Sequence, residues 1–154
     1  MKIVIAPQTF KGSLTASEAT DCISEAVLDV FPNSEIVKLP IADGGDGTLE
    51  TLVESYKGKF MESKISDPLG NKVISQWGLI GDIAIIEMAR SSGLALIDPK
   101  KLDPMNSTSF GTGQLILEAL NHNVSKIILG IGGSATNDCG VGVAKALGIK
   151  FLKD

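Results

Sequence analysis

A short apolar run that opens into a glycine-rich loop constrains this chain more than any other feature. Residues Lys126–Gly130 read KIILG, and the segment Ile131–Gly140 that follows reads IGGSATNDCG. Glycines let consecutive N–H groups turn into one concavity, and the start of a helix beyond the loop adds a positive dipole end. The pattern therefore predicts a buried strand, an anion-binding loop and a helix, in that order, within an α/β fold.

The same loop also fits a second kind of site. From Gly130 onward the spacing matches the dinucleotide fingerprint G-x-G-x-x-G/A, and Asp154 lies near the place where such folds hold a ribose-binding acid. The adjacent Asn137 and Asp138, and the other glycine-rich loops of the chain, fit this interpretation poorly. An NAD(P)-binding oxidoreductase domain remains an open alternative.

Composition excludes several classes of partner. With 154 residues, 44% of them hydrophobic, the chain can bury a real core. The net charge of −4 and the lack of a basic stripe argue against nucleic acid binding. Arg90 is the only arginine, so an anion site must use lysine and backbone N–H groups. Because the sequence begins directly with a strand pattern and has no apolar run approaching ~18 residues, we expect a cytoplasmic protein without a membrane partner.

The first 58 residues alternate strands with helices. Thr15 and Glu18 form a capping box, T-x-x-E, at the start of a helical pattern. We expect a strand at Lys2–Ala6, a helix from Thr15 to about Val30, a strand at Glu35–Leu39 and a short helix at Thr48–Tyr56.

The middle of the chain changes to strands without helices between them. Phe60–Ser66 and Lys72–Leu79 flank the turn sequence DPLGN and read as a hairpin. A second turn leads into the strongly apolar strand Ile83–Met88. These three strands predict an antiparallel β-meander.

The last part returns to alternation. We expect a loop at Ser109–Gly113, a helix from about Gln114 to Leu120, the strand at Ile127, a helix from about Val141 to Leu147 and a strand at Ile149–Leu152. The whole pattern predicts an α/β fold with a mainly parallel sheet, helices on both faces and an antiparallel β-meander unit. It divides the chain into an α/β segment at 1–58, an antiparallel segment at 59–89 and an α/β segment with glycine-rich loops at 90–154. A bare final strand would favour self-association through its edge.

Phosphoryl transfer needs an anion cradle, a metal held by carboxylates, a cation and a group that orients the attacking hydroxyl. Loops that follow predicted strands or begin predicted helices offer these parts, at the edge where open α/β sheets bind ligands. Lys11 lies in TFKGS, and Asp43 and Asp46 lie in ADGGDGT. Each also has a structural interpretation, because lysine is often solvated and aspartate often forms turns.

Three further residues carry the same ambiguity. Ser109 and Thr112 precede a helix and could simply be caps. Glu87 lies within an apolar strand, where an unpaired carboxylate is costly. It either faces the site or pairs with a buried partner, and Arg90 is the obvious local candidate.

Together, these segments resemble the bacterial glycerate kinase family of the glycerate 2-kinase type. The resemblance spans the chain through KIVIAPQTFKGS, ADGGDGT, ISDPLGNKV, AIIEMARSSGL, NSTSFGTGQLI and GIGGSATND, in matching order and separation. It implies a two-domain kinase that phosphorylates D-glycerate to phosphoglycerate with ATP and Mg²⁺. By matching motif, the site region includes Lys11, Asp43, Gly44, Gly45, Asp46, Ser109, Gly111, Gly132, Gly133, Ser134, Asn137 and Asp138.

Chemistry then suggests individual roles. We predict that Lys11, Asp46 and Asp138 are catalytic, with Asp46 and Asp138 as metal ligands. The other members of the region, together with Thr112, are predicted to bind substrate or phosphate.

Departures from the family pattern are few. Gln8 and Thr9 replace the aspartate and serine of the common family pattern A-P-D-S-F-K-G. Cys139 replaces the first of the two glycines in the common pattern T-N-D-G-G. An amide at position 8 weakens any metal or base role there. Family members are more than twice this length, so the chain corresponds to their N-terminal part. A fragment of this kind is expected to turn over glycerate poorly, and a noncatalytic anion-binding fragment is a further alternative.

Overall fold

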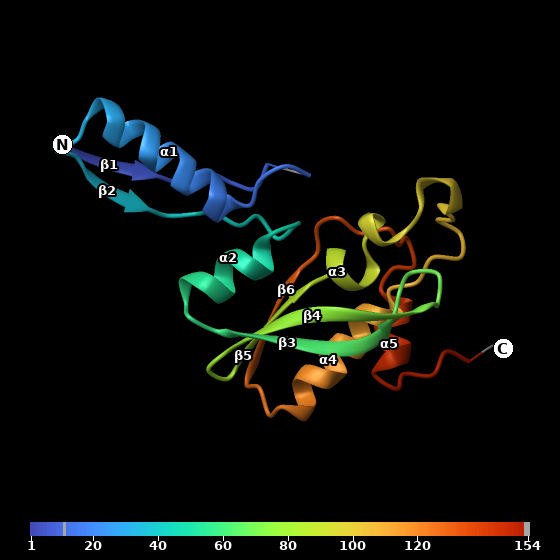
Figure 1. The fold of residues 1–154 in the computed structure, drawn as a ribbon. Helices are drawn as coiled ribbons and strands as arrows, with labels where there is room; N and C mark the ends of the chain where they lie inside the picture. The colour runs from blue at the N-terminus through green and yellow to red at the C-terminus, as the bar shows by residue number, and fades with distance from the viewer. Residues whose placement is uncertain (11, 153–154) are drawn as a thin grey trace.

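A computed structural model describes residues 1–10 and 12–152 of the chain, which contain two sheets (Figure 1). Strands β1 (Lys2–Ile5) and β2 (Glu35–Lys38) pair in parallel beside the helix α1 (Ala16–Val30). Thr15 caps α1 through the predicted capping box, in which its side chain accepts from the Glu18 N–H and the Glu18 carboxylate accepts from the Thr15 N–H. The predicted α/β class is confirmed.

The second sheet has four strands in the order β3-β4-β5-β6. They are β3 (Lys59–Ser66), β4 (Lys72–Ile80), β5 (Ile83–Glu87) and β6 (Lys126–Gly130). The first three form the antiparallel meander, and β5 also pairs in parallel with β6. The meander therefore shares one sheet with the strand that precedes the glycine-rich loop.

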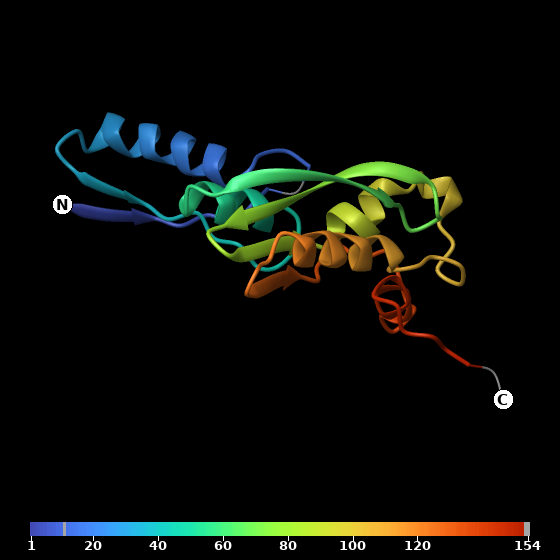
Figure 2. The same cartoon turned by 90° about the horizontal axis from the view of Figure 1, so that it is seen from below.

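Helices cover both faces of this sheet (Figure 2). On one face α4 (Phe110–Asn121) packs its Leu115 onto a core around Trp77. On the other face α2 (Thr48–Ser55) packs its Leu49 onto Ile85. Neighbours of Ile85 in β5 point to the α4 side, as the period of two in a strand requires.

Short helical segments complete the connections. A helix α3 (Ala89–Ser92) and two 3₁₀ turns, Leu94–Leu96 and Pro99–Lys101, follow β5. The last helix, α5 (Val141–Ala146), packs against α4 and confirms the helix expected after the glycine-rich loop. None of the helices within residues 1–10 and 12–152 is long and apolar enough to cross a membrane.

Two expected elements are wrong. The helix α4 begins at Phe110 rather than near Gln114, so the segment expected as a loop at Ser109–Gly113 forms its first turn. Residues 149–152 form no strand, and the exposed side chain of Phe151 lies beyond α5 without a sheet partner. The self-association expected through that strand therefore loses the edge it requires.

Candidate functional site

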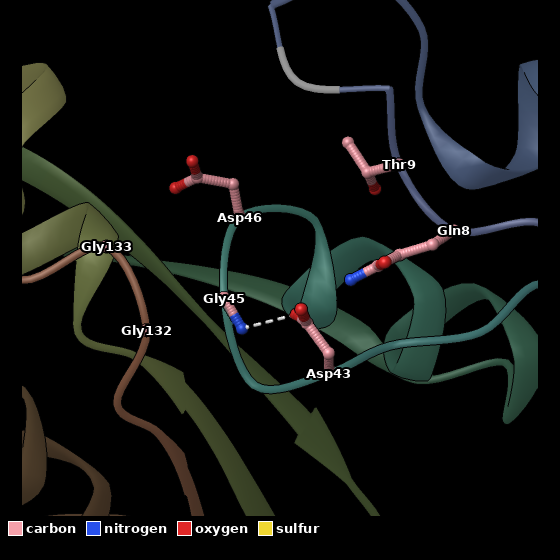
Figure 3. A pocket seen from close by; sticks show the side chains of 7 residues that line it. All are labelled: Gln8, Thr9, Asp43, Gly45, Asp46, Gly132 and Gly133. Carbon is pink, nitrogen blue, oxygen red and sulfur yellow. Dashed lines mark hydrogen bonds between the residues drawn. The ribbon is translucent and has the colours of Figure 1, made fainter.

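Three loop segments that each follow a parallel strand meet around a pocket of about 350 Å³. Gln8 and Thr9 follow β1, the Asp43–Gly47 loop follows β2, and the loop beginning at Ile131 follows β6. The carboxyl ends of parallel strands are where α/β proteins bind ligands. The lining side chains and glycines, here called the Asp46 pocket, are Gln8, Thr9, Asp43, Gly45, Asp46, Gly132 and Gly133 (Figure 3).

Two glycine pairs allow the loops to meet backbone to backbone. The Gly132 N–H donates to the Gly44 carbonyl at 2.8 Å. A Cβ added at Gly132 would lie 2.6 Å from the Gly45 Cα, closer than a carbon atom can approach without a backbone shift. The glycines predicted as an anion cradle thus have an immediate structural reason, which is the contact between the two loops.

Asp43 closes its own loop at the rim of the pocket. Its Oδ1 accepts from the Gly45 N–H at 2.9 Å, and the Gln8 side chain also hydrogen-bonds to it (Figure 3). These bonds, with the Gly45 N–H contributing most, hold the pKa of Asp43 below its ordinary value. Gln8 therefore supports Asp43, a role that the sequence alone did not indicate.

Asp46 is exposed and borders the loop from β6. A Cβ added at Gly133 would lie 3.2 Å from the Asp46 Oδ1, so this carboxylate lies against that loop. Its charge acts on two neighbours, the buried Glu87 and the partly buried Arg90. The pocket thus combines two exposed carboxylates, Asp43 and Asp46, at the meeting point of the loops.

The buried Glu87 has partners of both expected kinds. Its Oε2 accepts from the Leu49 N–H at 2.9 Å, and its Oε1 lies 3.8 Å from the Arg90 Nε. Burial raises the pKa of Glu87, the nearby Asp46 charge adds to that rise, and backbone N–H groups at the start of α2 partly offset it. Arg90 pairs chiefly with Glu50, and burial lowers the pKa of its guanidinium.

Asp138 lies in a different constellation, outside the pocket lining. Its Oδ2 accepts from the Ser109 N–H at 2.8 Å, the Ser109 Oγ at 2.9 Å and the Gly142 N–H at 2.9 Å. Its Oδ1 accepts from the Gly140 N–H at 3.1 Å. Burial raises the pKa of Asp138, but the bonds from Ser109, Gly142 and Gly140 outweigh it, and the pKa lies below its ordinary value. We call Ser109, Asp138, Gly140 and Gly142 the Asp138 cap.

The remaining predicted residues are distributed around that cap. Ser109 is buried, and its Oγ accepts from the Val143 N–H at 3.1 Å. Thr112 is fully buried and shares hydrogen bonds with the hydroxyls of Ser91 and Ser92. Gly111 lies directly against the Ser66 carbonyl. These residues at the start of α4 occupy the interior rather than the pocket.

Ser134 and Asn137 lie in the connection between the two constellations. The Ser134 Oγ bonds to the Thr136 Oγ1 at 2.9 Å, and Asn137 is exposed. Lys11 lies outside the described residues. Within residues 1–10 and 12–152, no group of three or more histidine, cysteine or acidic side chains could hold a metal ion. The predicted joint metal site of Asp46 and Asp138 stays a prediction.

Comparisons with known proteins agree with one another. The profile of the glycerate kinase family matches residues 3–154. A glycerate kinase of Haemophilus influenzae is 54% identical over 154 residues, covering 99% of this chain and 41% of that protein. A glycerate 2-kinase of Escherichia coli is 49% identical over 153 residues, covering 98% of this chain and 40% of that protein.

A solved structure shows the same fold. It is the crystal structure of a protein provisionally designated glycerate kinase 2 from Salmonella typhimurium LT2, which is 48% identical with a TM-score of 0.83. It matches over 96% of this chain and 41% of its own. The chain therefore spans about two fifths of the length of the relatives that it matches.

Proposed function

This chain belongs to the glycerate kinase family, and we propose that it serves the ATP-dependent phosphorylation of D-glycerate to phosphoglycerate, as all or part of such a kinase. The observation that carries this proposal is the Asp46 pocket, where segments following three parallel strands meet around the exposed carboxylates of Asp43 and Asp46. Its volume of about 350 Å³ suits a small hydroxy acid.

The charge of the pocket supports a role for Mg²⁺. Among the described lining residues the charged side chains are Asp43 and Asp46, both acidic. Glycerate and ATP are anions, so each would be repelled unless a cation lies between them and the carboxylates. Magnesium prefers one or two carboxylates together with phosphate oxygens and water, and a pocket with two exposed carboxylates fits that preference. When bound, Mg²⁺ would neutralise charge on the transferred phosphoryl group.

The chain's own residues then divide the remaining work. Asp46 accepts the proton of the reacting hydroxyl or contributes an oxygen to the metal, and Lys11 supplies positive charge to the substrate carboxylate or the phosphoryl group. Asp43 shapes the rim of the pocket through its bonds to Gly45 and Gln8. The Asp138 cap orders the loop from β6.

A coupled assay tests this proposal. The protein is mixed with MgATP, and ADP release is followed with and without D-glycerate, while ³¹P spectra of the product identify which hydroxyl is phosphorylated. Because the chain spans about two fifths of the length of its relatives, we expect slow glycerate-dependent ADP release. Asp46→Asn should abolish this release, and Asp82→Asn, in the turn before β5, should leave it intact. Calorimetric titrations with glycerate and with MgATP accompany the assay. Neither turnover nor saturable binding of either compound would contradict the proposal.

A further inference from the structure

The helix α2 begins at Thr48, two residues after Asp46, and its N-cap residue provides no side-chain cap. Its N-cap residue is Gly47, which has a φ of 89° and no side chain to accept a hydrogen bond. The first N–H groups of a helix need acceptors from elsewhere when they are buried. Leu49, in this first turn, is fully buried. The Leu49 N–H therefore requires an acceptor from another part of the fold.

Glu87 supplies that acceptor from the end of β5. Its side chain is 2% exposed, and its Oε2 accepts from the Leu49 N–H at 2.9 Å across 38 residues of sequence. The N–H groups of Gly47 and Thr48 also hydrogen-bond to this carboxylate. The three donors follow Asp46 consecutively in the chain. One carboxyl group thus accepts from consecutive N–H groups at the start of α2, where the Thr48 N–H also donates to the Gly45 carbonyl at 3.2 Å.

Arg90 holds the same turn from a second side. Its guanidinium pairs with Glu50 in the first turn of α2, and its Nη1 donates to the Gln76 Oε1 at 3.4 Å. Its Nε lies 3.8 Å from the Glu87 Oε1. Glu87 and Arg90, three residues apart on one segment, therefore fix both the backbone and a side chain of this turn to the four-stranded sheet.

We propose that Glu87 is a positioning residue that holds Asp46 in place at the pocket, because it accepts hydrogen bonds from the turn that follows Asp46. Glu87 does not line the pocket and acts only through the Asp43–Gly47 loop. The proposal rests on the proposed kinase function for its catalytic consequence. It explains why a glutamate stands in an otherwise apolar strand, where a hydrophobic residue would pack at no cost in desolvation.

Two substitutions separate hydrogen-bond acceptance from charge. Glu87→Gln retains an oxygen that can accept from the Leu49 N–H, whereas Glu87→Ala removes every acceptor. We expect Glu87→Ala to lower kcat for glycerate phosphorylation by roughly 10- to 100-fold with a smaller change in KM, since misplacement of a reacting group affects the transition state most. Glu87→Gln should remain within about threefold of the wild-type protein. Asp82→Ala, at the opposite end of β5, is the matched control and should leave both constants unchanged.

Amide hydrogen exchange measures the stability of the loop independently of activity. We expect Glu87→Ala to accelerate exchange at residues 45–49 while the amides of β3 and β4 remain protected, and Glu87→Gln to behave as the wild-type protein. Unchanged exchange at 45–49, or unchanged kcat per folded molecule in Glu87→Ala, would overturn the positioning role. A Glu87→Gln variant as impaired as Glu87→Ala would overturn it too. A wild-type protein without glycerate turnover would contradict the proposed function, and the exchange measurement would then still decide whether Glu87 holds the loop.

Discussion

The Asp46 pocket and the Asp138 cap arise from similar sequences but use their aspartates in different ways. In each region a pair of glycines is followed within a few residues by an aspartate. Asp46 is exposed and lines a pocket, whereas Asp138 accepts hydrogen bonds with both carboxylate oxygens from the starts of two helices. The local motif alone does not distinguish an aspartate that lines a pocket from one whose carboxylate accepts hydrogen bonds at helix starts.

The difference follows from what lies C-terminal to each aspartate. After Asp46 the uncapped start of α2 receives its acceptor from Glu87 on another strand, so Asp46 itself is not needed as the cap. After Asp138 the start of α5 receives its acceptor from Asp138, which also bonds to Ser109 at the start of α4. The first N–H groups of a helix need acceptors from outside the helix, and these acceptors come from a distant strand at α2 but from the adjacent aspartate at α5.

The largest expected effect is a loss of activity when Asp46 is replaced. Asp46→Asn should reduce kcat/KM for glycerate phosphorylation by about 10²- to 10³-fold, because a positioned proton acceptor or metal ligand is lost. Stability should change little, since the side chain is exposed. Steady-state kinetics and urea denaturation measure the two quantities. Asp46→Asn with normal turnover would remove Asp46 from the chemistry and break the contrast with Asp138.

The next effect should appear in stability. Asp138→Ala removes the acceptor for Ser109 and for two N–H groups of the cap, so the free energy of unfolding should fall by about 2–3 kcal/mol. Denaturation midpoints at constant m-value measure the loss. A variant as stable as the wild-type protein but without activity would instead return Asp138 to the catalytic site.

The pH dependence of this loss provides a control. The folded pKa of Asp138 lies below its ordinary value, which is about 4. The contribution of this carboxylate to the free energy of unfolding is therefore fully present above about pH 4 and is lost as pH falls through the folded pKa. The wild-type protein and Asp138→Ala should therefore converge in stability on acidification. A gap that widens toward low pH would contradict the hydrogen-bonding account.

Sequence patterns predicted local elements well and long-range partners poorly. The capping box of Thr15 and Glu18, the hairpin around DPLGN and the helix after the glycine-rich loop all depend on neighbouring residues and are confirmed. The early start of α4 was missed because Gly111 and Gly113 disfavour a helix locally. There they permit close packing, since a Cβ at Gly113 would lie 2.7 Å from the Ala146 Cβ.

The candidate site shows the same limit. The grouping of the Asp43–Gly47 loop with Gly132 and Gly133 could be expected from strand ends. The bond from the Leu49 N–H to Glu87 joins residues 38 apart, and no periodicity or spacing encodes it. Gln8 likewise acquires its contact with Asp43 only when β1 and β2 lie side by side.

A glycine in each region offers a smaller test. Gly132→Ala should cost about 2 kcal/mol, because its Cβ would press against the Gly45 backbone and push the two loops apart. Gly140→Ala should cost about 1 kcal/mol, because a φ of 75° is strained for alanine although its Cβ meets open space. Thermal and urea unfolding compare the variants. Equal losses of stability in the two variants would show that the contact between Gly132 and Gly45 costs no more to disturb than the backbone strain at position 140.

The smallest effect concerns Cys139, which stands where the family commonly has glycine. Its φ of 52° places it in the left-handed region, and its side chain is exposed. Cys139→Gly should raise the free energy of unfolding by about 0.5–1 kcal/mol, because relief of this strain exceeds the entropy that glycine adds to the unfolded chain. Lys57→Gly, at a φ of 53° after α2, is the matched control and should gain a similar amount. If Lys57→Gly is stabilised while Cys139→Gly is destabilised, the cysteine side chain itself supports the Asp138 cap, and the two regions differ in more than their aspartates.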